Sequence, residues 1–415
     1  MEKPNTTSNV IRGCGIAILV LLLIGTIFVG FIATAFGGVV AFCFMSIIAV
    51  FWVFCIFSLS NILKLKPRLI LFGSIETVLI IAFIITDTHY SREQARIRQI
   101  ESEMRLPGVN QHINLQDYEP FSVGSRVVRF NDNEEITLQF TDNLPRLDGA
   151  TALYPVYSAF VQAVYPSGDY SLPQRDSTDI DYRDLIVRCS TTGTAYENLI
   201  KGEVDIIFVA GISNEHNTLA QRNGIELEFT PIGRDAFVFF VNSANPVNSL
   251  TTAQIRDIYS GEITNWKELG GEDVDIFPYQ REVNSGSQTA MENLMVNTPL
   301  MRPPMEDVVE YTMEAMIFQV ESTHHRNRPN AIGYSFLYFT TEMASADQIK
   351  LLSLDGVAPT RENIVNGTYP QSGYFYAVTV KGSDEDNPNI SAFIEWILSE
   401  QGQYLIEKTG YTPLN

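Results

Sequence analysis

Apolar residues dominate the first 86 positions, whereas later positions alternate short apolar runs with polar loops. No charged residue occurs between Gly13 and Leu63. That stretch is too long for a single membrane helix, which needs about 20 residues, and it exceeds the apolar core of a cleavable signal peptide. A glycine pair, Gly37 and Gly38, lies near its middle. We therefore predict spans over about 14–36 and 39–60 and a third over about 69–86.

Basic residues predict how these spans are oriented. They precede the first span and separate the second from the third, at Lys3, Arg12, Lys64, Lys66 and Arg68. Basic flanks face the cytoplasm. The third span would then exit outward, so we expect a multi-pass protein of the cell membrane, in contact with lipid, with everything after Asp87 on the extracytoplasmic side. Glu76 inside the third span is either a protonated residue bonded to a neighbouring helix or a functional group.

After a polar connector over 88–133, a strand, a loop and a helix follow one another repeatedly. Strands are expected at 135–140, 185–189, 204–210, 236–241 and 275–280, and helices near 155–160, 195–201 and 288–295 and from Thr251. This alternation predicts an α/β fold with mainly parallel strand pairing.

Small hydroxyl residues or glycine stand where three of these strands end and a helix begins. The loops hold Thr151 with Ala152, Thr191 with Thr192, and Ser285, Gly286 and Ser287, with Arg281 four residues before the last group. Helix starts expose unpaired N–H groups and a partial positive charge, which together attract anions. One such loop would also serve as an ordinary helix cap, and Arg281 alone would suit a solvated surface. Three loops with one arginine favour an anion site.

Composition excludes several other functions. The formal net charge is −20, although the first 86 positions carry more basic than acidic residues, so nucleic acid is not an expected partner. Cys189 is the single cysteine after the membrane part, which rules out a disulfide there. The adjacent His324 and His325 are expected on the surface, not at a metal. The sequence has neither a GxSxG nor an HExxH motif. We expect no enzyme, no metal and no cofactor.

Six segments resemble the phosphate-binding protein of phosphate ABC transporters, in the periplasmic-type solute-binding superfamily. They occupy 148–155, 204–210, 231–242, 250–266, 279–289 and 402–413, among them DGATALYP, PIGRDAFVFFVN and YQREVNSGSQT. The resemblance covers about two thirds of the chain in the family's order and leaves out the membrane part.

The resemblance implies an α/β, two-lobed periplasmic-binding-protein-like fold of type II, here preceded by three transmembrane helices. The first lobe would hold about 134–240 and 346–415 and the second about 243–344, with crossovers near 239–242 and 339–343. Inorganic phosphate would bind between the lobes and pass to ABC permease and ATPase subunits. By position in the motifs, the ligand-binding residues would be Thr151, Ala152, Thr191, Thr192, Arg281, Ser285, Gly286 and Ser287.

One departure leaves selectivity open. Ala210 stands where many members of the family carry an aspartate that accepts a proton from phosphate. Such a carboxylate would reject fully deprotonated sulfate by setting two acceptors face to face. Asp148 or Glu282 could substitute, and sulfate or another tetrahedral oxyanion is an alternative ligand. A membrane oxyanion sensor is the alternative to transport.

Overall fold

The structure is a computed structural model. It describes residues 113–131, 133–172, 184–301, 309–310, 313–321, 330–344 and 346–414. The chain divides into two compact units, Met1–Asn110 and Gln111–Asn415, and all described residues belong to the second. The predicted spans, the connector up to 112 and the histidine pair lie outside the described residues. Within the described ranges, no helix has both the length and the apolar character needed to cross a bilayer.

The first lobe is built on a mixed sheet. β1 (Leu147–Gly149) pairs in parallel with β2 (Ile206–Val209), and β11 (Ser372–Val380) lies antiparallel between β2 and β3 (Leu227–Asn242). All four residues of β2 are buried, as expected of a strand that is covered on both faces.

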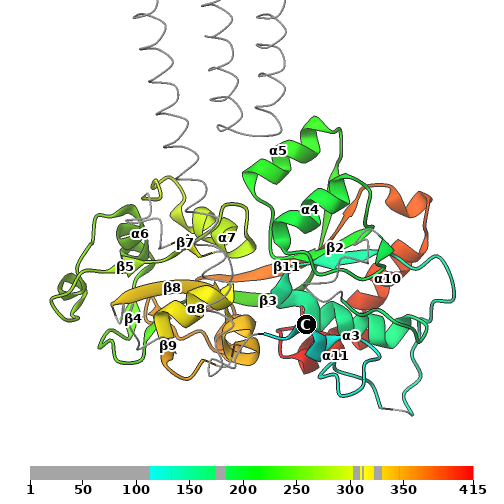
Figure 1. The fold of residues 1–415 in the computed structure, drawn as a ribbon, viewed down its shortest axis with the longest axis horizontal. Coiled ribbons are helices and arrows are strands. Elements are labelled where there is room, and N and C mark those ends of the chain that lie inside the picture. The colour runs from blue at the N-terminus through cyan, green and yellow to red at the C-terminus, as the bar shows by residue number, and fades with distance from the viewer. Residues whose placement is uncertain are drawn as a thin grey trace, which may run out of the picture. The chain divides into compact units, whose positions relative to one another are not determined.

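Helices cover both faces of this sheet (Figure 1). Ile207 and Val209 of β2 pack against α4 (Thr192–Ile200), whereas Ile206 and Phe208 belong to the main core. Successive side chains of a strand point to opposite faces, which explains this division. The remaining helices of this lobe are α3 (Tyr154–Val164), α5 (Asn214–Arg222), α10 (Asn389–Leu398) and α11 (Glu400–Thr409), with short 3₁₀ turns at Leu115–Tyr118, Thr151–Leu153 and Ser383–Glu385.

β3 runs through both lobes. Its first part pairs with β11 as far as Ala236, and from Phe237 its partner is β8 (Ala331–Phe336). β9 (Ile349–Leu351) pairs with its last three residues. Every side chain from Ala236 to Asn242 is buried, which anchors the crossing strand in the core.

The second lobe surrounds β8. β5 (Phe277–Pro278) lies parallel to β8. Two small parallel pairs join β4 (Ser249–Leu250) to β10 (Ser353–Leu354) and β6 (Gln280–Arg281) to β7 (Val309–Glu310). The helical segments are α6 (Thr252–Ser260), α7 (Gly286–Met295), α8 (Met313–Glu321), α9 (Arg361–Val365), a 3₁₀ turn at Trp266–Leu269 and a π-helical turn at Phe339–Met343.

The predicted helix start at Thr251 is confirmed by a capping box. The Thr251 hydroxyl accepts the Gln254 N–H, and the Gln254 side chain accepts the Thr251 N–H. Gly261 closes the same helix in the left-handed conformation that glycine tolerates.

Three expectations about the strands are wrong. Residues 185–189 form no strand and contribute only an isolated bridge from Val187 to Leu147. Residues 135–140 form no strand: Phe140 donates to the Val164 carbonyl, and Thr137 bonds the Gln401 side chain. The pairing in the described sheets is also not mainly parallel, because the long pairings of β3 with β11 and with β8 are antiparallel. The alternation of strands and helices predicted that strands consecutive in sequence would pair in parallel through a crossover helix. Instead β11, which comes much later in the chain, lies antiparallel between β2 and β3.

Strand pairing also shows where the chain changes lobe. The switch along β3 falls between Ala236 and Phe237. After Phe339–Met343, β9 and β10 still pair with strands of the second lobe, and the chain joins the first sheet again at Ser372. By strand pairing, the second crossing of the chain, from the second lobe back to the first, therefore lies after 339–343, the segment that the sequence predicted for it.

Candidate functional site

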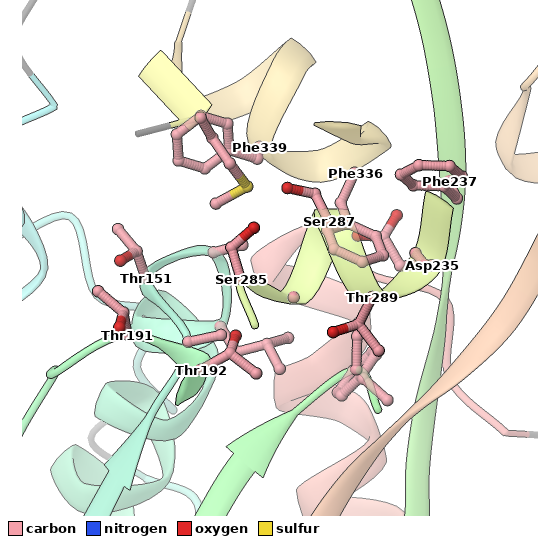
Figure 2. A pocket seen from close by; sticks show the side chains of 18 of the residues that line it. Thr151, Thr191, Thr192, Asp235, Phe237, Ser285, Ser287, Thr289, Phe336 and Phe339 are labelled. Atoms are coloured by element: carbon pink, nitrogen blue, oxygen red, sulfur yellow. The ribbon is translucent and has the colours of Figure 1, made fainter. Parts of the chain in front are cut away.

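One pocket of about 770 Å³ collects all eight residues that the sequence singled out. Figure 2 labels Thr151, Thr191, Thr192, Ser285 and Ser287 among them. Thr151, Ala152, Thr191 and Thr192 come from the first lobe, and the other four come from the second. Part of the remaining wall is apolar and includes Phe237, Phe336 and Phe339. The sequence predicted which residues meet, and their role as ligands stays a prediction.

The first loop connects β1 to α3. Gly149 is required there because an added Cβ would lie 2.7 Å from the carbonyl oxygen of Phe208 on β2. Thr151 and Ala152 then open a 3₁₀ turn that continues into α3. The Tyr411 hydroxyl donates to the Ala152 carbonyl, so the C-terminal tail fixes this turn.

The second loop contains a strained residue. Thr191 has φ 77° and ψ 167°, a conformation that is essentially restricted to glycine. It stands at the N-cap position of α4, yet its side chain makes no capping hydrogen bond. Strain of this kind persists only where the surroundings impose it, and it concentrates at ligand sites.

The third loop opens α7 and meets the second. Ser285 caps α7, accepting the Gln288 N–H at 3.3 Å. An added Cβ on Gly286 would lie 2.7 Å from the Thr192 Oγ1, so it would displace this hydroxyl or separate the two loops. Beside it, the Asn284 amide donates to the Glu215 carboxylate at 2.6 Å.

Arg281 lies at the pocket wall, with 7% of its surface exposed. Its Nη1 donates to the Ser287 Oγ at 3.1 Å. Its backbone N–H donates to the Tyr334 hydroxyl at 2.9 Å and to Gln288 Oε1 at 3.1 Å. These bonds fix the position of its backbone and of one guanidinium nitrogen. Among the described residues that line the pocket, Arg281 is the only basic one.

The pocket therefore combines several elements that favour an anion. The starts of α4 and α7, and the turn that leads into α3, border one cavity. Each presents N–H groups that have no partner within the helix and the positive end of a dipole. Hydroxyl groups and one guanidinium add donors, and a guanidinium can bind an oxyanion through two parallel hydrogen bonds.

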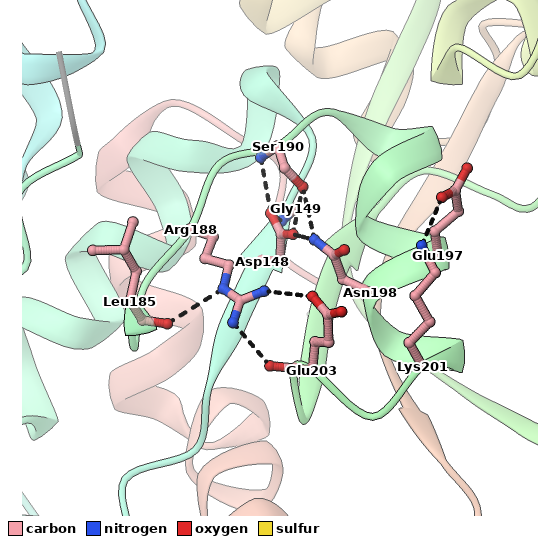
Figure 3. Close-up of polar contacts among 9 residues, drawn as sticks. All are labelled: Asp148, Gly149, Leu185, Arg188, Ser190, Glu197, Asn198, Lys201 and Glu203. Atoms are coloured by element: carbon pink, nitrogen blue, oxygen red, sulfur yellow. Dashed lines mark hydrogen bonds and ion pairs between the residues drawn. The ribbon is translucent and has the colours of Figure 1, made fainter. Parts of the chain in front are cut away.

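Asp148 does not contribute to the pocket, although the sequence made it a candidate acceptor. It is fully buried. It accepts the N–H groups of Gly149 and Ser190, the Ser190 hydroxyl and the Asn198 amide (Figure 3). Burial raises the pKa of this carboxyl, while the four donors act in the opposite direction. Asp148 thus connects the first two loops through hydrogen bonds, at a buried position that does not line the pocket.

Three other carboxyl groups do line the pocket, those of Asp235, Glu282 and Glu314. Glu282, the other candidate from the sequence, has its pKa raised by burial, and the charge of Arg281 lowers it in part. Asp235 on β3 was missed by the sequence reasoning. The sequence signal for it was a carboxylate directly before the apolar run 236–241, in the segment PIGRDAFVFFVN.

Neither a thiolate nor a metal is indicated. Cys189 lines the pocket as a free thiol, and burial raises its pKa to about 12, so it is neutral near pH 7. Across the described ranges, no group of three His, Cys, Asp or Glu side chains is arranged to hold a metal ion.

Two α/β lobes joined by a crossing strand, with a polar pocket between them, define a two-lobed ligand-binding domain. A family model described as the PBP superfamily domain matches residues 141–401, more than half of the chain. The chain belongs to this superfamily.

Relatives within the superfamily support the resemblance seen in the sequence. The chain is 27% identical over 235 residues to the phosphate-binding protein PstS of Bacillus subtilis, covering 56% of this chain and 71% of that protein. It is 24% identical over 289 residues to protein SphX of Synechococcus elongatus, covering 65% and 84%. A Clostridium perfringens structure with bound phosphate, assigned as a substrate-binding protein of a phosphate ABC transporter, is 25% identical with a TM-score of 0.49, covering 65% and 98%. The match to PstS confirms the predicted resemblance to phosphate-binding proteins.

Proposed function

We propose that this protein is a membrane-anchored, extracytoplasmic binding protein that captures inorganic phosphate and delivers it to an ABC-type importer. The eight residues Thr151, Ala152, Thr191, Thr192, Arg281, Ser285, Gly286 and Ser287 form the binding site. The role is binding and not catalysis, and the permease and ATPase subunits of the importer are its partners.

The observation that carries this proposal is the convergence of three helix-start loops and Arg281 on one pocket. A tetrahedral oxyanion offers several acceptor oxygens, and the pocket offers amide, hydroxyl and guanidinium donors from both lobes. The relatives named for phosphate binding favour phosphate among such ions.

The membrane anchor rests on the sequence alone. The apolar stretches at 14–36, 39–60 and 69–86 are long enough to span a bilayer. The basic residues that flank them place the ligand-binding domain outside.

Calorimetric titration of the full-length protein in detergent tests the ligand. Phosphate is expected to bind at one site per chain, at least about tenfold more tightly than sulfate or molybdate, a difference of about 1.4 kcal/mol. Absence of phosphate binding by the folded protein would refute the proposal. Tighter binding of sulfate or molybdate would assign the pocket to a different oxyanion.

A further inference from the structure

Part of the pocket wall comes from a segment that precedes the superfamily domain. Residues 113–116 line the pocket, whereas the match to the family model begins at 141. Along the chain, this segment follows the apolar stretches that the sequence assigns to the membrane. The ligand site therefore has a wall that lies outside the matched residues.

The first lobe holds one end of this segment. The 3₁₀ turn at Leu115–Tyr118 packs against α3. The Phe121 N–H donates to the Gln162 Oε1 of α3 at 2.7 Å. Glu119 is buried, and its Oε1 accepts the Leu172 N–H at 2.8 Å. Leu172 also lines the pocket, so this end of the segment fixes a second part of the wall.

The second lobe holds the other end. The Ile113 N–H donates to the Glu314 Oε1 at 3.0 Å. Glu314 lies in the first turn of α8 and lines the pocket. Ile113 and Leu115 are partly buried and pack against the main core. Between 113 and 121 the chain is thus bound to both lobes beside the pocket.

The charge of Glu314 does not favour direct contact with an anion. Among the described pocket residues, three carboxyl groups face one basic side chain, that of Arg281. Burial raises the pKa of Asp235 to about 7 and also raises the pKa of Glu282, which favours their neutral forms. The carboxylate of Glu314 would repel a bound anion. Any favourable effect of Glu314 on phosphate binding must therefore come through the segment that it holds.

We propose that residues 113–118 form a strap that joins the two lobes beside the pocket, and that Glu314 is the residue that positions it. This inference rests on the proposed function. A hydrogen bond between the lobes forms only when they are close together, so it stabilises the closed arrangement. Phosphate held by both lobes binds that arrangement, so the strap should strengthen phosphate binding. By the same linkage, bound phosphate should order the strap and thereby fix the end of the connector.

Calorimetric titration of phosphate into the full-length Glu314→Ala protein in detergent tests the strap. Binding should weaken at least about fivefold, because a charge-assisted hydrogen bond between the lobes is lost. Loss of repulsion alone would instead strengthen binding, so the sign of the change separates the two effects. Glu314→Gln keeps an acceptor for the Ile113 N–H and should bind phosphate within about threefold of the parent.

The matched control is Glu321→Ala on the same helix. The Glu321 carboxylate also accepts a backbone N–H, that of Gln348 at 3.1 Å, but neither residue lines the pocket. Its phosphate affinity should match the parent.

Hydrogen exchange followed by mass spectrometry measures the strap directly. Phosphate should slow amide exchange over 113–118 at least about tenfold in the parent and in Glu321→Ala, and should have little effect there in Glu314→Ala. A purely structural role of Glu314 would lower the free energy of unfolding and leave this response to phosphate unchanged.

Each result decides. If folded Glu314→Ala binds phosphate as tightly as the parent or more tightly, or if Glu314→Gln binds as weakly as Glu314→Ala, Glu314 does not position a strap, although the proposed function stands. Exchange over 113–118 that phosphate does not slow, in a parent that binds phosphate, refutes the inference in the same way. If the parent does not bind phosphate, the proposed function fails and this inference fails with it. If Glu314→Ala does not fold, the exchange response of the parent decides instead.

Discussion

Close contact between Gly286 and Thr192 sets how tightly the second and third loops can approach. Gly286→Ala would place a Cβ 2.7 Å from the Thr192 Oγ1. Relief requires the Thr192 hydroxyl to rotate or α7 to move away from α4, and overpacking of this kind costs about 1–3 kcal/mol. We expect phosphate affinity to fall about fivefold to more than a hundredfold in calorimetric titration.

The control for this change is Gly168→Ala. An added Cβ there would meet the Tyr170 ring at 3.4 Å, an ordinary contact away from the pocket. Its phosphate affinity should match the parent. A folded Gly286→Ala protein with parental affinity would show that the two loops do not need this approach.

Asp235 also predicts a pH dependence of stability. Its pKa rises from 3.8 to about 7 on folding, so the folded state holds the proton more tightly than the unfolded state. Its contribution to stability is therefore full below the unfolded pKa and is lost as the pH rises through about 7. The loss is on the order of 2–4 kcal/mol.

Asp235→Asn removes this titration. Without ligand, the variant should be more stable than the parent at about pH 8, and the difference should shrink toward about pH 4. Urea unfolding at both pH values measures it. A difference that is the same at both, or larger in acid, would show that folding does not raise the pKa of Asp235.

At the scale of elements, α7 joins the stability of the fold to the site. Ser285 caps α7, whereas Ser287 in the first turn accepts from Arg281. Ser285→Ala should lower the free energy of unfolding by about 1 kcal/mol. Both Ser285→Ala and Ser287→Ala should weaken phosphate binding by about fivefold, since one neutral hydroxyl contributes about 1 kcal/mol.

Unfolding and titration of the two variants separate these roles. If Ser287→Ala lowers the free energy of unfolding as much as Ser285→Ala, the capping hydrogen bond of Ser285 does not make a separate contribution to stability. If neither variant changes phosphate affinity, the hydroxyls do not contact the ligand.

The elements also show what the sequence could predict. The three loops were predictable because glycine and hydroxyl residues mark the start of each helix. β2 was predictable because it is a short apolar run that follows Asp205. β3 was predicted only in its apolar half. Its first part, where Glu228 and Pro231 interrupt the apolar pattern, takes its strand structure from pairing with β11. Pairing between such distant segments leaves no local signal.

The site was predictable where it lies at helix starts and not where it lies on the crossing strand. Thr151, Thr192 and Ser285 can be predicted from the sequence because they lie at helix starts. Asp235 does not, because its proximity to the pocket depends on where β3 changes sheet, between Ala236 and Phe237. That change is a property of the whole fold.

At the scale of the whole molecule, the proposed anchor predicts a topology. Basic residues at 64–68, between the proposed second and third spans, predict that the chain lies outside from Asp87 onward. A cysteine introduced as Asn110→Cys, in a chain whose native cysteines are replaced, should react with a membrane-impermeant maleimide on intact cells. A cysteine introduced as Asn61→Cys, beside the basic cluster, should react only after lysis. The reverse pattern would overturn the topology.

In the proposed phosphate site, Arg281 supplies the positive charge. Removal of one member of a buried charged pair costs about 2–5 kcal/mol. Arg281→Ala should therefore weaken phosphate binding by about thirtyfold to several thousandfold, and Arg281→Lys should restore only part because lysine lacks the planar fork.

The measurement is calorimetric titration of phosphate into the parent and the two full-length variants, with circular dichroism to confirm folding. Phosphate affinity is expected to decrease in the order parent, Arg281→Lys, Arg281→Ala. A folded Arg281→Ala protein that binds phosphate within about threefold of the parent would contradict it.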